Sequence, residues 1–205
     1  MMNRRFSADD CVEYMKKKYG RDFSFVRDAD KFQPTANSLE VFVSCPDFPG
    51  EDIYVVEEDT GESLRFSDDF PSVVYSGEVS GLLTELAGNV YGECKLLYSR
   101  LRNRIVPGSP ASLGEYISDP LSCVCFTVIL PPEADPVRRE ELAKSLADLL
   151  CSRKAVCSFK VCYTADRAVY ERITSLRDIP GTLGWYTACG HFSTNGSVLT
   201  SEAWR

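Results

Sequence analysis

The chain has 205 residues, of which 44% are hydrophobic and 26% charged, a composition typical of a folded globular protein that excludes a largely disordered chain. It contains no run of 18 apolar residues, so no membrane-spanning segment is predicted. The net charge of −7 argues against nucleic acid as a partner, because phosphate backbones are bound by clustered Lys and Arg. Basic residues near the start are not followed by an apolar segment, so no secretory signal is expected and a cytoplasmic location is predicted.

The first hundred residues alternate between helical and extended patterns. Apolar residues recur at helical spacing between Ser7, which is placed as an N-cap, and Gly20, which is placed to end the helix. Alternating patterns and turn residues then predict extended segments. The elements expected after the first helix are strands near 23–26, 39–45, 53–56 and 63–66, a helix over 78–91 and a strand over 94–101.

The second hundred residues repeat this alternation after a segment rich in turn-forming residues. Two prolines and a glycine predict a linker at 104–112. Beyond it, Asp135 is expected to cap a helix that starts at Pro136, with Leu142, Leu146, Leu149 and Leu150 as its buried stripe. Thr164 is expected to cap a later helix. The strands expected in this half are 121–130, 156–163 and 183–192, followed by a final hairpin at Asn195-Gly196.

Helix-to-strand junctions recur along the chain, and twice the junction is the same pair, Tyr19-Gly20 and Tyr91-Gly92. The pattern predicts an α+β fold with mainly antiparallel sheets and with helices packed on one face. The two halves are expected to be similar, with residues 1–103 forming the first, residues 113–205 the second, and the linker 104–112 between them.

Several of these segments resemble a group of small uncharacterised α+β proteins from Firmicutes. The resemblance rests on the helix end at 14–23, the hairpin over 38–57, Asp68-Asp69-Phe70, the helix end at Tyr91-Gly92 and the strand–helix–strand over 122–163. Many members of the group look like lipoproteins or membrane-anchored extracellular domains, and the group has no assigned activity. The resemblance therefore implies a fold and no function.

The nine cysteines are an odd number and are scattered through predicted helices and strands, which favours reduced core residues over a disulfide framework. His191 is the only histidine, so a Cys–His mechanism would have to use it together with Cys189. If their strands were neighbours, Cys123, Cys125, Cys189 and His191 could form a Cys₃His zinc site. Ligands two residues apart in a strand are splayed, so we assign no metal ligand, cofactor or catalytic residue.

Carboxylates are concentrated between Asp47 and Asp69, where nine of them accompany a single arginine, Arg65. No spacing among them matches a calcium loop, and Asp68 or Asp69 is expected to cap local turns. Such an acidic surface would recruit a basic protein partner.

The leading hypothesis for function is a non-enzymatic binding or protein-interaction module that acts through a sheet face, an edge strand or the acidic surface. The partner is an unknown protein, basic if the acidic surface binds it. The alternative hypothesis is a metal-binding protein or a Cys/His-dependent enzyme that uses Cys189 and His191. A third hypothesis is a subunit that serves oligomerisation of a larger assembly.

Overall fold

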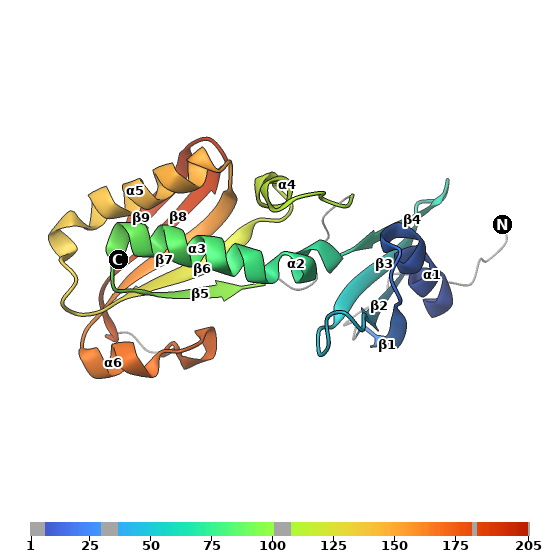
Figure 1. The fold of residues 1–205 in the computed structure, drawn as a ribbon, viewed down its shortest axis with the longest axis horizontal. Coiled ribbons are helices and arrows are strands. Elements are labelled where there is room, and N and C mark those ends of the chain that lie inside the picture. The colour runs from blue at the N-terminus through green and yellow to red at the C-terminus, as the bar shows by residue number, and fades with distance from the viewer. Residues whose placement is uncertain (1–6, 30–36, 101–107, 182–183, 205) are drawn as a thin grey trace. The chain divides into compact units, whose positions relative to one another are not determined.

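The structure is a computed structural model that describes residues 7–29, 37–100, 108–181 and 184–204. These residues form two compact units (Figure 1). The first unit comprises the described residues up to Val74 together with 108–109, and the second unit comprises the other described residues. Each unit has its own sheet and its own buried core.

The first unit is a four-stranded antiparallel sheet with helices on one face. Its strand order, β1-β2-β3-β4, follows the chain, so every pair of neighbouring strands is joined directly. Its elements are α1 (Ala8–Tyr19), β1 (Ser24–Asp28), β2 (Ser38–Ser44), β3 (Ile53–Asp59), β4 (Leu64–Asp68) and α2 (Phe70–Val74).

Helix α1 begins and ends where the sequence predicts. The Ser7 hydroxyl accepts a hydrogen bond from the Asp9 N–H at 3.2 Å, and three lysines in the last turn complement the helix dipole. Gly20 ends the helix in a left-handed conformation, φ 64°, and its N–H bonds the Lys16 carbonyl at 2.9 Å. The two caps therefore fix both ends of α1, and with them the residues that face the sheet.

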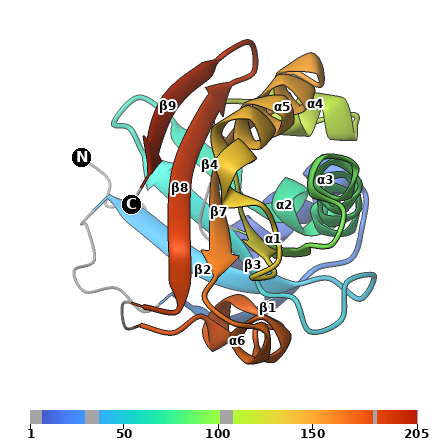
Figure 2. The ribbon, with the colours of Figure 1, turned by 90° about the vertical axis from the view of Figure 1, so that its left-hand side faces the viewer.

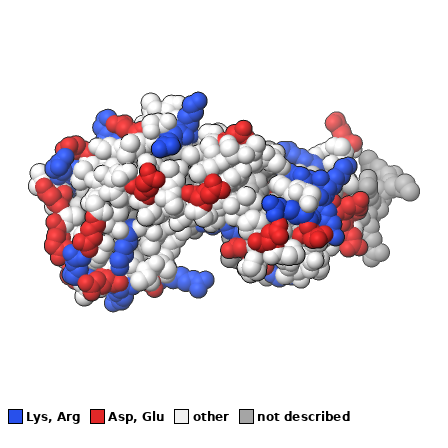
Figure 3. All heavy atoms as spheres, in the orientation of Figure 1, with Lys and Arg blue, Asp and Glu red and all other residues white. Residues whose placement is uncertain are grey.

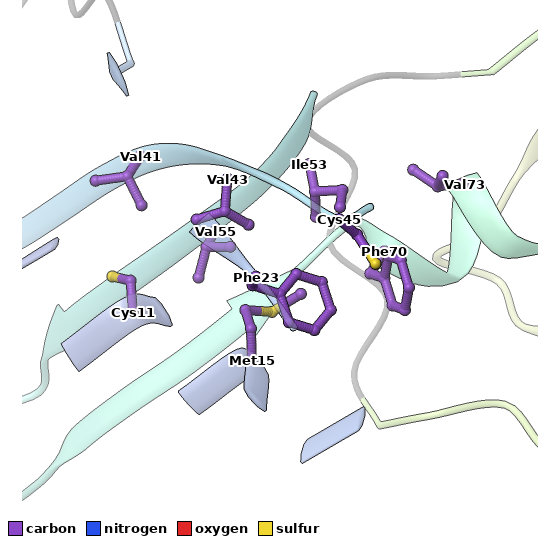
Figure 4. Packing of buried hydrophobic residues seen from close by; sticks show 10 residues of the cluster. All are labelled: Cys11, Met15, Phe23, Val41, Val43, Cys45, Ile53, Val55, Phe70 and Val73. Atoms are coloured by element: carbon purple, nitrogen blue, oxygen red, sulfur yellow. The ribbon is translucent and has the colours of Figure 1, made fainter. Parts of the chain in front are cut away.

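The core of the first unit lies between α1 and the sheet (Figure 4). Cys11 and Met15 of α1 are fully buried against valines of β2 and β3. At the end nearest α2, Phe70 meets Phe23 edge-to-face at a centroid distance of 5.2 Å and Phe48 at 5.5 Å. Aromatic pairs in this geometry add to the stabilisation from burial.

The second unit is a five-stranded mixed sheet with order β5-β6-β7-β8-β9. Strands β6 and β7 are parallel and are joined through α5, while the other neighbours are antiparallel. Its elements are α3 (Ser76–Tyr91), β5 (Lys95–Ser99), α4 (Leu113–Ser118), β6 (Val124–Leu130), η1 (Pro136–Arg138), α5 (Arg139–Ser152), β7 (Val156–Thr164), α6 (Arg167–Arg172), η2 (Leu176–Asp178), β8 (Tyr186–Asn195) and β9 (Leu199–Trp204).

Helices α3 and α5 pack together on one side of this sheet (Figure 2). The side chains beneath them form an aromatic row across four strands. Phe126 stacks on Phe159 at 5.2 Å, Phe159 on Phe192 at 5.0 Å, and the edge of Trp204 meets Phe192 at 5.3 Å. Cross-strand aromatic pairs stabilise the sheet register and close this face with apolar surface.

The α+β class with mainly antiparallel sheets is confirmed, and two details of the expectation differ. The helix and strand expected at 78–91 and 94–101 belong to the second unit, because α3 packs on α5 and β5 pairs with β6. Residues 104–107 of the expected linker lie outside the described residues. The two sheets differ in strand number, and α6 lies on the side of its sheet opposite to α3 and α5 (Figure 1).

Two local expectations in the second unit are wrong. Asp166, rather than Thr164, caps α6, because its carboxylate accepts from the Val169 N–H at 2.8 Å. The Thr164 hydroxyl instead donates to the Leu130 carbonyl. In α5 the buried stripe includes two alanines, and Leu149 is 36% exposed. In the described part of the chain, every helix is too short or too polar to cross a lipid bilayer.

Candidate functional site

One face of the five-stranded sheet is covered by a helix at one end only, and we call it the open face. Its members follow from the register, because residues two apart in a strand share a side and directly paired residues share it too. The open face comprises Lys95, Leu97, Cys125, Thr127, Ile129, Ser158, Lys160, Cys162, Cys189, His191, Ser193 and Ala203.

Helix α6 closes one end of the open face. Ile129, Cys162 and Cys189 are buried there beneath Tyr170 and Ile173. The apolar cover ends with this cluster, and no helix covers the rest of the open face among the described residues.

Lys95 holds α6 in place. Its ammonium donates to the backbone carbonyls of Tyr170, Glu171 and Ile173 at 2.6, 3.0 and 2.9 Å. These carbonyls lie at the C-terminal end of the helix, where the helix dipole favours a positive charge. The ammonium of Lys95 therefore stabilises the position of α6 and is not directed toward solvent on the open face.

Beyond α6 the open face is mainly polar, with Ser158 exposed and Thr127 only 6% exposed. Lys160 and His191 are exposed and lie directly opposite each other on β7 and β8. Thr127 on β6 is the partner of Lys160 on the other side, and Ser158 lies two residues before Lys160. One ammonium, one imidazole and two hydroxyl groups thus share a small area of sheet.

Two hollows adjoin these groups. The face hollow, about 190 Å³, is lined by Leu97, Cys125, Phe126, Thr127, Ser158, Phe159, Lys160 and Leu176. The edge hollow, about 510 Å³, is lined by Ser80, Leu96, Leu97, Tyr98, Thr174, Ser175, Leu176 and Arg177. Leu97 and Leu176 line both hollows, so the two meet at these leucines, beside edge strand β5.

The charge of the open face differs from that of the whole chain. The chain carries a net charge of −7, yet none of the open-face residues defined above is Asp or Glu. Within the described residues Lys160 forms no ion pair with a carboxylate. The open face is thus a positively charged area on an acidic protein.

The wall that carries Leu176 is held by a single carboxylate. One oxygen of Asp178 accepts from the N–H and hydroxyl of Thr174 at 3.0 and 2.8 Å, and from those of Ser175 at 2.7 and 3.0 Å. These hydrogen bonds, the Thr174 hydroxyl first, lower the pKa of Asp178 to about 2.

Titration of Asp178 should follow this geometry. We expect its carboxyl carbon to titrate at about pH 2 in the folded protein, measured by carbon-13 NMR. Because the pKa is lower in the folded state, the stabilisation from Asp178 is present above its unfolded pKa and is lost as pH falls through about 2. A midpoint near the ordinary aspartate value would contradict the hydrogen-bond geometry at this turn.

The structure separates the residues of the hypothetical Cys₃His site. Strand β7 lies between β6, which carries Cys125, and β8, which carries Cys189. The register also places Cys189 level with Ile129, four residues from Cys125 and therefore about 13 Å further along the sheet. Across the described ranges, no three His, Cys, Asp or Glu side chains are arranged to hold a metal ion.

Cys189 pairs with a second thiol. It lies directly opposite Cys162 on β7, and both are buried under α6. A hydrogen bond in which the Cys162 thiol donates to the Cys189 sulfur, followed by burial, raises the pKa of Cys162. His191 lies further along β8, opposite Lys160, on the exposed part of the face. The arrangement places Cys189 in a closed apolar cluster and His191 outside it.

All nine cysteines are free thiols. Burial is the largest cause that raises the pKa of both Cys11 and Cys157 to about 12. A thiol with a raised pKa has little thiolate at mildly alkaline pH and reacts slowly.

Alkylation with iodoacetamide should reflect this burial. We expect Cys11 and Cys157 to remain unmodified in the folded protein while the half-buried Cys123 and Cys151 react, as read by peptide mass spectrometry. In urea all nine should react. Labelling of Cys157 in the native state at its unfolded rate would show that the thiol is accessible and refute its assignment as core packing.

The acidic segment between Asp47 and Asp69 contributes less surface charge than its sequence suggests. Glu57, Asp68 and Asp69 are at most 1% exposed. Asp47 pairs with Arg21, and Asp52 lies 3.3 Å from Arg27. Basic and acidic side chains lie side by side on the face of the first unit that Figure 3 shows.

Asp68 is the centre of a buried polar network in the first unit. One oxygen accepts from the Lys18 ammonium at 2.7 Å and the Tyr14 hydroxyl at 2.9 Å. The other accepts from the Tyr19 hydroxyl at 2.7 Å and the Phe70 N–H at 3.1 Å. Asp68 therefore caps a local turn, as predicted, and also ties α1 to the end of β4, which the sequence did not indicate.

Lys160 and the open face were not singled out from the sequence, although a signal was present. In the strand at 156–163 the expected apolar face alternates with Ser158 and Lys160, which are polar and point to the opposite side. This alternation indicates an uncovered face. Leu176 could not be found in the same way, since its place beside the face depends on the turn at Asp178.

Comparison with known proteins yields one solved structure to report. No family model matches the chain, and no curated protein matches it. The chain is similar to the crystal structure of a DUF5037 family protein from Ruminococcus gnavus ATCC 29149, at 11% identity and a TM-score of 0.43. The match covers 95% of this chain and 94% of that one. That structure belongs to an uncharacterised family, and at this similarity it supports no statement about the activity or ligand of the present chain.

Proposed function

We propose that this chain is a non-enzymatic binding module whose binding surface is the open face together with the adjoining edge of β5. The observation that carries this proposal is the pair of hollows beside the incompletely covered side of the five-stranded sheet. Helices α3 and α5 occupy one side, whereas the other side is covered by α6 at one end only. A polar side of a sheet can simply face solvent, but hollows with leucine walls beside exposed polar groups favour a bound partner.

The other surfaces considered from the sequence are less favourable. Three of the nine carboxylates between Asp47 and Asp69 are buried and two more form ion pairs, which weakens the acidic surface as a binding site. The enzyme alternative would need Cys189 to be reachable, and its thiol packs in the cluster beneath α6.

The proposal can be tested with two double variants of equal chemistry. Lys160→Glu with Leu176→Asp changes the open face at positions that are exposed. Val137→Asp with Arg153→Glu makes the same kinds of change at the two ends of α5, on the covered side of the sheet. Both variants should keep the far-UV circular dichroism of the parent chain, because surface substitutions cost little.

Each immobilised chain is exposed to lysate, and bound proteins are quantified by mass spectrometry. We expect the parent chain and the α5 variant to retain the same partners, and the open-face variant to lose them. Retention of these partners by a folded open-face variant would refute the proposed surface.

A further inference from the structure

We infer that the open face binds an extended acidic peptide segment whose carboxylate pairs with Lys160. This inference rests on the proposed function and names the class of partner. It differs from the expectation of a basic partner, which depended on the acidic segment between Asp47 and Asp69.

The charge pattern supports an anionic partner. Lys160 is exposed beside the face hollow, and within the described part of the chain no carboxylate pairs with it. The open face supplies no Asp or Glu that would repel an incoming carboxylate. Thr127 and Ser158 line the same hollow and can donate hydrogen bonds to a second carboxylate oxygen.

The leucine side chains in the walls of the two hollows favour a ligand that carries an aliphatic group next to its carboxylate over a free inorganic ion. Leu97 and Leu176 line both hollows; Leu97 is 7% exposed and Leu176 is 38% exposed. A partner that places an aliphatic side chain against Leu176 buries apolar surface next to the carboxylate contact. Peptide segments combine both kinds of side chain at a short spacing.

The edge of the sheet favours an extended backbone. Among the described residues, strand β5 pairs with β6 on one side only, so its outer edge presents backbone groups that no described strand uses. The edge hollow runs along residues 96–98 of this strand, between Ser80 of α3 and the segment 174–177. A peptide that enters this hollow can add to β5 as a further strand, while Arg177 offers a second cation.

Nucleic acid fits these features less well. Binding of a phosphate backbone requires several clustered cations that follow the strand. The face hollow offers Lys160 and the edge hollow Arg177, while the charge of Lys95 is used to hold α6. Two cations beside leucine walls match a peptide that carries one or two carboxylates.

The test uses fluorescent peptides and the full-length protein, with binding followed by anisotropy. The first probe is a short, capped peptide of alternating leucine and glutamate, and its matched control replaces each glutamate with glutamine. A third peptide keeps the glutamines but has a free C-terminal carboxylate, which distinguishes side-chain from terminal carboxylates. A single-stranded oligothymidine is the nucleic-acid probe.

We expect one of the two carboxylate-bearing peptides to bind about fivefold more tightly than the capped glutamine peptide, with the difference falling at high salt. Lys160→Met keeps most of the side-chain stem and should abolish the difference. Lys144→Met, on the exposed surface of α5, should leave it unchanged.

Equal affinity for charged and uncharged peptides, no detectable binding of either carboxylate peptide, or binding of oligothymidine alone would overturn the inference. The same holds if Lys160→Met leaves the difference intact. These outcomes concern the class of partner only. If the open-face variant still loses its captured proteins, the binding surface stands and the acidic-peptide assignment alone falls.

Discussion

Replacement of Asp68 by asparagine is expected to lower the free energy of unfolding of the first unit by about 3 kcal/mol. The carboxylate is completely buried and accepts from Lys18, Tyr14, Tyr19 and the backbone of Phe70. An amide has no charge and can face the ammonium with only one oxygen. Loss of one partner from a buried charge pair costs more than the pair itself contributes, because the remaining charge stays desolvated. Lys18 is 17% exposed, so water relieves part of this cost.

Both tryptophans lie in the second unit, and this permits a clean measurement. Trp185 and Trp204 report unfolding of the second unit in urea, while hydrogen exchange with mass spectrometry follows peptides of α1 and β4. We expect exchange in α1 and β4 to rise in the variant and the tryptophan transition to stay in place.

Asp47→Asn is the matched control for Asp68, in the same unit. Its ion pair with Arg21 is exposed, so removal of its charge should cost less than about 1 kcal/mol. If the two variants proved equally stable, Asp68 would not be the link between α1 and β4.

Replacement of Gly190 by alanine is expected to destabilise the second unit by about 2–3 kcal/mol. A Cβ at this position would lie 2.5 and 2.6 Å from ring carbons of Phe192 and 2.9 Å from the ring of Trp204. Phe192 is held in turn by its stack on Phe159, so neither ring can move without disturbing the aromatic row. The tryptophan transition in urea should shift to lower denaturant concentration.

Gly81→Ala controls for the loss of a glycine as such. Gly81 lies exposed in the middle of α3, and an added Cβ would meet no atom within 4 Å. Alanine is the better helix former, so this variant should stabilise the second unit by about 0.5–1 kcal/mol. Equal effects of the two substitutions would show that the packing around Gly190 is loose.

Periodicity and capping residues were sufficient to predict the longer helices and most of the strands. Ser7 and Gly20 bound α1 as expected because capping is a local interaction. Leu149 was wrongly expected to be buried. Helix α5 buries alanines where it packs on its neighbours, and which residues face a neighbouring helix depends on packing rather than on the sequence period. The short helices α2 and α4 carry too few turns to show a period.

The open face was partly predictable and partly not. The alternation that includes Ser158 and Lys160 predicts a polar side of β7 from the sequence alone. That β7 separates β6 from β8 depends on the crossover through α5, so the distance between Cys125 and Cys189 could not be read from their spacing. Burial of Asp68 likewise depends on α1, which lies fifty residues earlier in the chain.

The most direct test of the account uses the imidazole of His191. The chain has one histidine, which lies on the open face opposite Lys160, so carbon-13 labelling of histidine gives a single signal from the proposed surface. On titration with the partner purified by capture, the account predicts that this signal shifts or broadens in step with binding. An unchanged His191 signal at saturation would place the partner elsewhere on the protein.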